Sequence, residues 1–278
     1  MADLVGVFAA SHGPLIVRDW HRVPPASRNR LTGAFQELGR RLSAVRPDVL
    51  IEVSPDHWVN FFMNNLPSIC IGVGETHAGP PEPFLKDFPW KSIPGHPALA
   101  GHLVETALRQ DFEPSISHHL TLDHGFCIPL WRMELASLPC VIPMVINDLE
   151  PPMPGIRRCL SWGKLLADAV ASFPGTLRVA VLATGGMSHS IGEPAMGEID
   201  EPFDRGCIQA FTAGAEDPLI GFLDSRLGST GNGAHEMRNW VVAHGAAGSR
   251  GFDLIDYLPV PEVYVGCGFA SWNLGRAR

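Results

Sequence analysis

Six short apolar runs rich in valine and isoleucine recur along the chain, and stretches with the apolar spacing of helices lie between them. The runs cover residues 4–10, 48–54, 68–74, 139–146, 177–183 and 261–267. The helical stretches cover residues 27–45, 97–110, 156–172, 203–224 and 233–246. Strands that alternate with helices predict an α/β fold, in which helices flank both faces of a mainly parallel or mixed central sheet.

The length and composition of the chain are typical of one large domain. The chain has 278 residues, of which 45% are hydrophobic, so it can bury a substantial core, and we expect residues 1–278 to form a single domain. Residues 75–97 differ from the rest because they contain six prolines and two glycines. We predict an irregular loop there, and long loops in compact domains often serve a functional site.

Charge and hydropathy argue against two kinds of partner. The formal net charge of −8 disfavours nucleic acid and anionic membranes, which attract basic surfaces. No apolar stretch reaches the roughly 18 residues of a membrane-spanning helix, and we see no basic segment of a secretory signal at the start. The six cysteines form no C-x-x-C pair, so we expect reduced thiols in a cytoplasmic protein.

Three of the apolar runs lead into a histidine. His12 follows the first run, His57 follows the second, and His189 follows the run at 177–183. Open α/β sheets place ligand sites just outside the carboxyl ends of their strands, so these imidazoles can converge. A fourth histidine, His124, lies in a loop-like segment. Taken alone, His12 is more typical of packing, but a group of imidazoles suits metal binding or acid–base catalysis.

Glu236 is the carboxylate best suited to join these histidines. It follows a glycine-rich approach to a predicted helix, where a glutamate is also typical of a first turn beside the helix dipole. The preceding His235 suggests the zinc-protease motif H-E-x-x-H, but position 239 is Asn239. Two histidines and one carboxylate, here His12, His57 and Glu236, match the facial triad that holds non-haem Fe(II).

Five short motifs together resemble the class III extradiol ring-cleaving dioxygenases, the superfamily of the protocatechuate 4,5-dioxygenase catalytic β-subunit. They read Ser11-His12-Gly13-Pro14, Asp56-His57, Leu122-Asp123-His124-Gly125, Gly185-Gly186-Met187-Ser188-His189, and Asn232-Gly233 leading to Glu236 and Trp240. They follow the family's order from the first strand to the last helix. The resemblance implies one catalytic domain, with His12, His57 and Glu236 as Fe(II) ligands.

The resemblance also implies a reaction. His124 and His189 would be the acid–base residues beside the metal, and we lean towards His189 as the base and His124 as the proton donor. The substrate would be a catecholic acid of the protocatechuate, gallate or methylgallate type, cleaved with O₂ to a semialdehyde or dicarboxylic product. Manganese suits the same ligands. A non-catalytic binding or signalling protein and a metal-dependent hydrolase are the alternatives, although no G-x-S-x-G motif supports the latter.

Three further expectations concern partners and substrate. Charged residues make up 18% of the chain, below the roughly 25% of typical soluble domains, and we expect a homo-oligomer or a complex with a small accessory subunit. Arg18, Arg22 and Arg28 follow the His12 loop and are candidates to bind a substrate carboxylate. Asp56 is a candidate to orient the ring of its neighbour His57.

Overall fold

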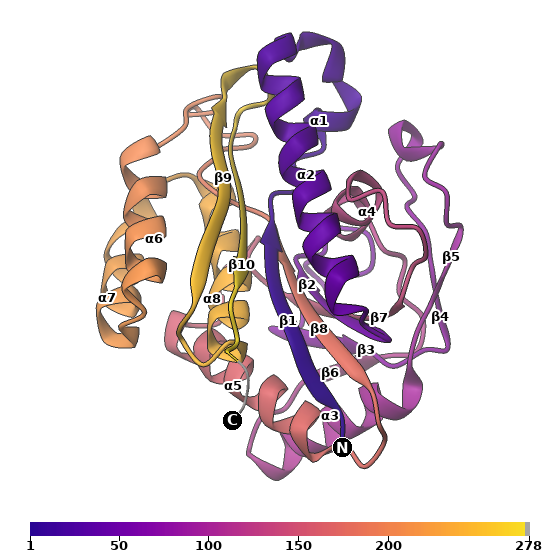
Figure 1. The fold of residues 1–278 in the computed structure, drawn as a ribbon. Coiled ribbons are helices and arrows are strands. Elements are labelled where there is room, and N and C mark those ends of the chain that lie inside the picture. Colours follow the sequence, from indigo (N-terminus) through magenta and orange to yellow (C-terminus); the bar gives the residue numbers. More distant parts are fainter. Residues whose placement is uncertain (276–278) are drawn as a thin grey trace.

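The centre of the computed structural model, which describes residues 1–275, is an eight-stranded mixed sheet (Figure 1). From edge to edge its strands are β6 (Ser115–Ser117), β3 (Ile69–Gly72), β7 (Cys140–Ile146), β2 (Val49–Ser54), β8 (Arg178–Thr184), β1 (Asp3–Ala10), β10 (Val265–Trp272) and β9 (Phe252–Val260). The four central strands β7, β2, β8 and β1 are parallel, whereas β3 and β10 run antiparallel to them. The predicted α/β fold with a mixed sheet is confirmed.

Helices cover both faces of the sheet, as predicted. One face carries α2 (Pro25–Val45) and α4 (His124–Arg132), and the other carries α3 (Pro97–Arg109), α5 (Ile156–Ser172) and α8 (Met237–Ala246). In Figure 1, α6 (Glu201–Ala213) and α7 (Glu216–Arg226) lie together beside β9. The short helix α1 and the 3-10 turns cover Leu15–Arg18, Trp20–Arg22, Pro83–Leu85, Leu227–Ser229, Asn232–Glu236 and Pro261–Val263.

The central strands read as unbroken apolar runs because both of their faces are buried. In β2, Val49, Ile51 and Val53 pack into the core beneath α5 and α8, and Leu50 packs into the core beneath α2 and α4. Among residues 1–275, none of the helices combines the length and apolar character needed to cross a bilayer.

Several predicted boundaries were wrong, each for a local reason. The stretch 203–224 is two helices, because Gly214 takes a left-handed conformation (φ 69°) that ends α6. The run 261–267 begins with a 3-10 turn, and the unpredicted edge strand β9 precedes it. The helix expected from residue 233 begins at Met237, because residues 232–236 form a 3-10 turn.

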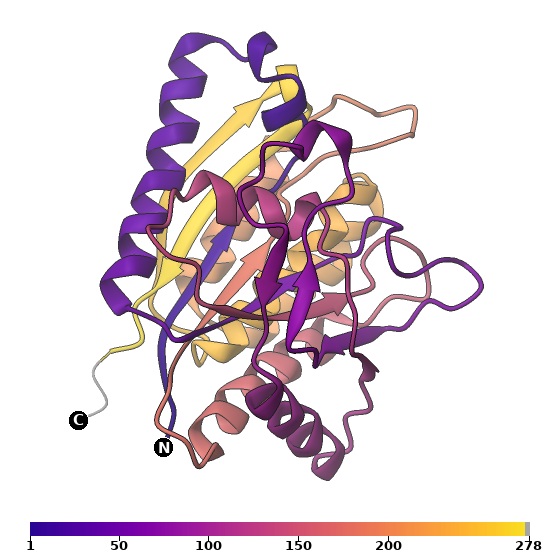
Figure 2. The same cartoon turned by 90° about the vertical axis from the view of Figure 1, so that its right-hand side faces the viewer.

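The proline-rich segment 75–97 is more regular than predicted. Strands β4 (Thr76–Ala78) and β5 (Ser92–Pro94) pair antiparallel within it, as Figure 2 shows in front of the main sheet. Its side chains Leu85, Phe88 and Ile93 are buried and anchor it to the core beneath α2 and α4.

This segment also holds the approach to α4. The Ala78 N–H donates to the Leu120 carbonyl at 3.0 Å, and the Leu122 N–H donates to the Ala78 carbonyl at 2.9 Å. The chain is therefore fixed just before Asp123 and His124, where the side chain of Asp123 caps α4.

Glu52 of β2 is an ionisable group in the middle of the sheet. Its side chain is fully buried, and neither carboxyl oxygen has a hydrogen-bond partner among the described residues. Burial raises the pKa of Glu52 well above its ordinary value, and the nearby charge of Asp123 raises it further. A raised pKa means that this carboxyl stabilises the fold less as the pH rises above about 4.

We expect Glu52→Met to stabilise the protein by about 1–3 kcal/mol at pH 8. The methionine side chain is similar in size to that of glutamate but has no buried, unpaired carboxyl group. The gain should be smaller at pH 5, since the wild-type carboxyl is then protonated in a larger share of unfolded chains. Urea unfolding at both pH values measures the difference. Glu105→Gln, at an exposed position of α3, is the control and should change little. A gain that does not vary with pH would contradict the explanation.

Candidate active site

The structure brings all five predicted site residues to one edge of the sheet. His12 lies two residues after β1, His57 three residues after β2, and His189 five residues after β8. Since β8 lies between β1 and β2, the three segments leave the sheet side by side. His124 is the first residue of α4, and Glu236 ends the 3-10 turn before α8.

Glu236 is the common contact of three imidazole rings. Its Oε1 lies 3.4 Å from His12 Nε2 and 3.6 Å from His57 Nε2. The same oxygen lies 3.7 Å from His189 Nε2. Its Oε2 accepts the Gly186 N–H at 2.6 Å. The His124 ring centroid is 3.9 Å from that of His57, so the fourth ring joins the cluster through its contact with His57.

Acceptor oxygens outside the cluster hold two of these rings at Nδ1. His57 Nδ1 lies 3.2 Å from Asp123 Oδ2, and His189 Nδ1 lies 3.1 Å from the Met187 carbonyl oxygen. Carbonyl and carboxylate oxygens only accept hydrogen bonds, so each ring carries its proton on Nδ1. Its Nε2 then faces Glu236.

His12 and His124 are held in the same way. His12 Nδ1 lies 3.1 Å from Thr184 Oγ1, and the Thr184 hydroxyl lies 3.4 Å from the Val53 carbonyl to which it can donate. His124 Nδ1 lies 2.8 Å from Glu82 Oε1, which also accepts the His124 backbone N–H at 2.9 Å. Such outer contacts fix the tautomer and orientation of metal-binding or catalytic histidines.

Burial and charge oppose each other in this cluster. Burial lowers the pKa of His12 to about 4, against the attraction of Glu236. Burial alone raises the pKa of the Glu236 carboxyl, but the charges of His12 and His189 outweigh it and hold that pKa well below its ordinary value. Burial likewise lowers the pKa of His57, and the Asp123 carboxylate outweighs it and raises that pKa. Glu236 is therefore an anion at neutral pH.

These donors fit a divalent metal ion. One ligand atom from each of His12, His57 and His124 lies within 4.8 Å of the others. Glu236 Oε1 adds a carboxylate oxygen close to the first two. Imidazole nitrogen and carboxylate oxygen are donors that iron and manganese accept.

The cluster lines a pocket of about 480 Å³, a size typical of small-molecule sites. Part of its wall is apolar and consists of Leu15, Trp58, Leu149, Ile191, Met196, Val263 and Val265. Of the three candidate arginines, Arg18 lines this pocket. Arg28 instead donates to the Val23 carbonyl at 2.7 Å, and the Arg22 guanidinium lies 6.0 Å from the Tyr264 ring centroid.

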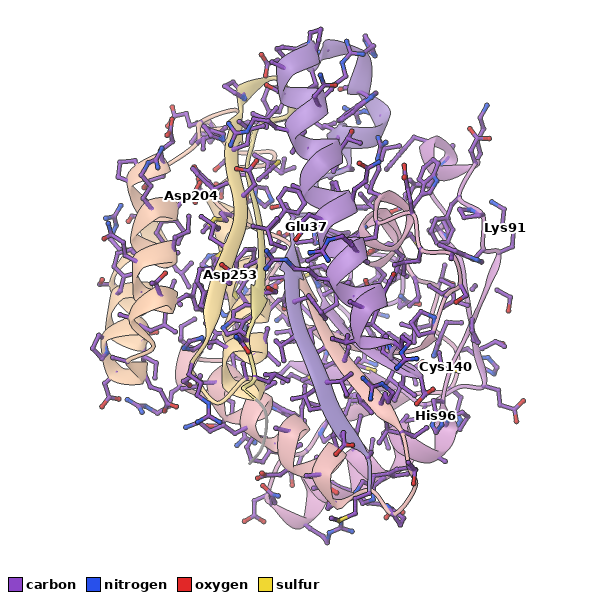
Figure 3. All side chains as sticks on the ribbon, in the orientation of Figure 1. Glu37, Lys91, His96, Cys140, Asp204 and Asp253 are labelled. Carbon is purple, nitrogen blue, oxygen red and sulfur yellow. The ribbon has the colours of Figure 1, made fainter. Side chains whose placement is uncertain are left out.

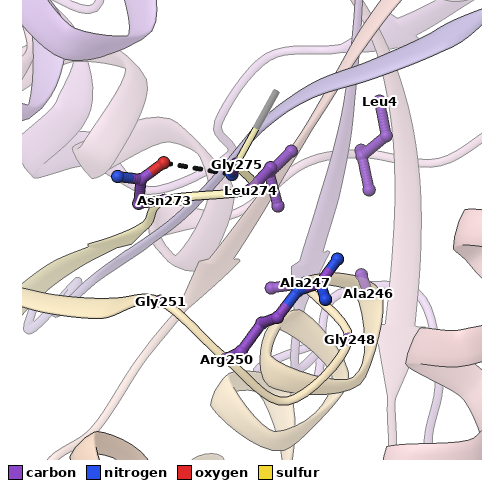
Figure 4. A pocket seen from close by; sticks show the side chains of 9 residues that line it. All are labelled: Leu4, Ala246, Ala247, Gly248, Arg250, Gly251, Asn273, Leu274 and Gly275. Atoms are coloured by element: carbon purple, nitrogen blue, oxygen red, sulfur yellow. Dashed lines mark hydrogen bonds between the residues drawn. The ribbon is translucent and has the colours of Figure 1, made fainter. Parts of the chain in front are cut away.

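A second pocket, of about 710 Å³, lies at the opposite end of β1 (Figure 4). It is lined by Leu4, Ala246, Ala247, Gly248, Arg250, Gly251, Asn273, Leu274 and Gly275. This lining contains no histidine or carboxylate, so the chemically competent groups lie in the first pocket.

The carboxylate that orients His57 was mispredicted. The Asp56 side chain accepts the backbone N–H groups of Val59, Asn60 and Phe61. Asp123 takes the ring contact instead, although it is 66 residues away in the chain. Its place in the motif around His124 was visible in the sequence, but the contact with another motif was not.

Sequence reasoning also missed Glu82 and Thr184. Glu82 lies in the proline-rich segment that we flagged as functional, and Thr184 ends the strand that leads to His189. His235 was correctly left out of the cluster, because its Nδ1 contacts Arg238 at 3.0 Å.

The sequence of the chain also matches a known protein family. Residues 6–266 match the family described as the catalytic LigB subunit of aromatic ring-opening dioxygenase. The chain belongs to this family. It is an extradiol aromatic ring-opening dioxygenase, as the five motifs predicted, and it acts on a small molecule and O₂. The binding-protein and hydrolase alternatives are thereby disfavoured.

Relatives of this dioxygenase cover nearly its whole length. A 2,3-dihydroxyphenylpropionate/2,3-dihydroxicinnamic acid 1,2-dioxygenase of Klebsiella pneumoniae (strain 342) is 27% identical over 313 residues, with 94% of this chain and 96% of the relative covered. The enzyme of that name from Escherichia coli (strain K12 / DH10B) is 30% identical over 317 residues, with the same coverage. The crystal structure of the uncharacterized protein JW3007 from Escherichia coli K12 shares the fold, with a TM-score of 0.65, 16% identity, and 96% and 99% of the two chains covered.

The dioxygenase site leaves no room for a side chain at Gly233. A Cβ atom there would overlap the His189 ring, so we expect Gly233→Ala to displace that ring. Turnover should fall by roughly ten- to a hundredfold, as small misplacements of catalytic groups do, while metal content stays unchanged. Gly228→Ala is the matched control, because nothing lies within 4 Å of its Cβ position. Oxygen uptake and metal analysis measure both, and full activity of Gly233→Ala would refute the packing argument.

Proposed function

We propose that this dioxygenase cleaves a catechol ring by the extradiol route with Fe(II) held by His12, His57 and Glu236. The position of Glu236 Oε1, 3.4 and 3.6 Å from the two Nε2 atoms, carries the proposal. Two imidazoles and one carboxylate form a facial triad, which leaves adjacent metal positions open for substrate and O₂. His124 is assigned to proton transfer because Glu236 already supplies the anionic donor of the triad.

The iron, when bound, would supply Lewis acidity towards the catechol oxygens and a redox path to O₂. His189 would then accept a catechol proton at Nε2, since the Met187 carbonyl holds its Nδ1 proton. His124 would donate a proton as the ring opens, with its ring held at Nδ1 by the Glu82 carboxylate at 2.8 Å. Both oxygen atoms would enter a ring-opened semialdehyde or dicarboxylic product.

We propose a substrate with a carboxylate on the catechol. The apolar pocket wall suits an aromatic ring, and Arg18 brings a cation to the same pocket. Protocatechuate and gallate carry their carboxylate directly on the ring. The named relatives act on 2,3-dihydroxyphenylpropionate, which carries it on a propionate side chain. The chemistry common to both types is a catechol that bears an acid.

We also propose that the chain acts as a single catalytic domain in a cytoplasmic homo-oligomer. The support is its low charged fraction of 18% and its six free cysteines. A complex with an accessory subunit stays the alternative. Ile191 and Met196 line the pocket and are partly exposed, so they present an apolar surface that such a subunit would cover.

Loss of a ligand and loss of a proton-transfer residue should have different consequences. After anaerobic loading with Fe(II), Glu236→Ala and His57→Ala should retain no iron. His124→Ala and His189→Ala should retain it and lose roughly 10²–10⁴-fold in turnover. Iron analysis and O₂ uptake with a catechol measure the two effects. Release of iron by His124→Ala would instead favour a three-histidine site, and a wild-type chain that binds no metal would overturn the proposal.

The substrate proposal predicts O₂ uptake and a yellow ring-fission product with 2,3-dihydroxyphenylpropionate, protocatechuate or gallate. Arg18→Gln should raise KM for the acid that reacts by about two- to fivefold, the range of an exposed ion pair. KM for unsubstituted catechol should not change. Arg22→Gln is the control, because Arg22 is not among the residues that line the pocket. An equal rise for the acid and for catechol would exclude a carboxylate contact.

A further inference from the structure

A buried carboxylate on α6 holds the segment that carries His189. Asp204 is fully buried, and Figure 3 labels it on α6 beside β9. Its Oδ1 accepts the Ser188 N–H at 2.8 Å, and its Oδ2 accepts the Ser188 hydroxyl at 2.9 Å. Two contacts to one residue fix both the backbone and the side chain of Ser188, the immediate neighbour of His189.

Further hydrogen bonds join this contact to the edge of the sheet. Tyr257 of β9 donates its hydroxyl to Asp204 Oδ2 at 2.7 Å. The Ser188 hydroxyl accepts the Asp200 N–H at 2.9 Å, and the Ser188 carbonyl accepts the Gly266 N–H at 3.0 Å. The segment before His189 is thus tied to α6, β9 and β10 at once.

The fold makes space for this carboxylate and loses stability by burying it. A Cβ atom at position 266 would overlap Asp204 Oδ2, so Gly266 leaves the room that the carboxylate needs. Burial raises the pKa of Asp204 to about 6, although the Tyr257 and Ser188 donors oppose the shift. An apolar residue would fill the same volume at lower cost.

Residues 186–189, the segment that Asp204 holds, contact the active site at two points. Its Gly186 N–H donates to Glu236 Oε2 at 2.6 Å. Its Met187 carbonyl accepts from His189 Nδ1, and His189 Nε2 lies 3.7 Å from Glu236 Oε1. A shift of Ser188 therefore moves the ring of His189 relative to the substrate pocket.

We propose that Asp204 is a positioning residue that, through Ser188, holds the His189 ring in its reactive orientation. This inference rests on the proposed role of His189 as the catalytic base. Asp204 itself contacts neither the pocket nor the metal ligands, so its effect is indirect. We expect iron binding by His12, His57 and Glu236 to survive its loss, because Asp204 makes no direct contact with these three residues.

The test is Asp204→Asn, which replaces the Oδ2 acceptor shared by two hydroxyl donors with an amide of the same shape. We expect kcat to fall by about tenfold, while KM and iron content stay unchanged. In a His189→Ala background the same substitution should lower kcat no further, because residues that act through one another are not additive. Cys207→Ala, at a buried position one turn along α6, is the control for simple destabilisation and should leave kcat unchanged.

A second measurement does not require turnover. The rate at which diethyl pyrocarbonate modifies His189, followed by peptide mass spectrometry, should rise several-fold in Asp204→Asn and stay at the wild-type rate in Cys207→Ala. Unchanged kcat and unchanged modification would overturn the inference, and so would an additive loss of kcat in the His189→Ala background. If the wild-type enzyme consumed no O₂, the proposed function would fail, while the modification rate would still decide whether Asp204 orients His189.

Discussion

The buried carboxylate of Glu236 is the constraint on which the rest of the site depends. An ion removed from water costs several kcal/mol unless charges and hydrogen bonds compensate. Here the compensation comes from the Gly186 N–H and from imidazoles of separate segments. Gly185 is required at this point, because its φ of 108° and its contact with Glu236 leave no place for a side chain. The same buried negative charge is what suits the site to a divalent cation.

A surrounding set of acceptors gives each imidazole its direction. Thr184, Asp123, Glu82 and the Met187 carbonyl each take one Nδ1 atom. They come from β8, the α4 cap, the proline-rich segment and the loop after β8, so the orientation of the rings is a property of the whole fold. His124 has a carboxylate partner and His189 a neutral carbonyl partner, so the two rings differ in their immediate surroundings.

Much of the fold was predictable because local patterns determine local structure. Unbroken apolar runs marked the parallel strands, and helix α5 has the predicted bounds of 156–172. The edge strand β9 escaped notice because its residues alternate less clearly and are only partly buried. The two-helix structure of 203–224 depended on a single glycine whose left-handed conformation is not visible in an apolar pattern.

The sequence by itself determined which residue types reach the carboxyl edge of the sheet, because His12, His57 and His189 each follow a strand by a few residues. The order of the motifs was also sufficient to indicate the dioxygenase family. Only the tertiary structure decided that Asp123 rather than Asp56 contacts His57, that Glu82 contacts His124, and that Asp204 holds the segment before His189. These pairs lie 66, 42 and 16 residues apart, and such contacts form only when separate elements pack together.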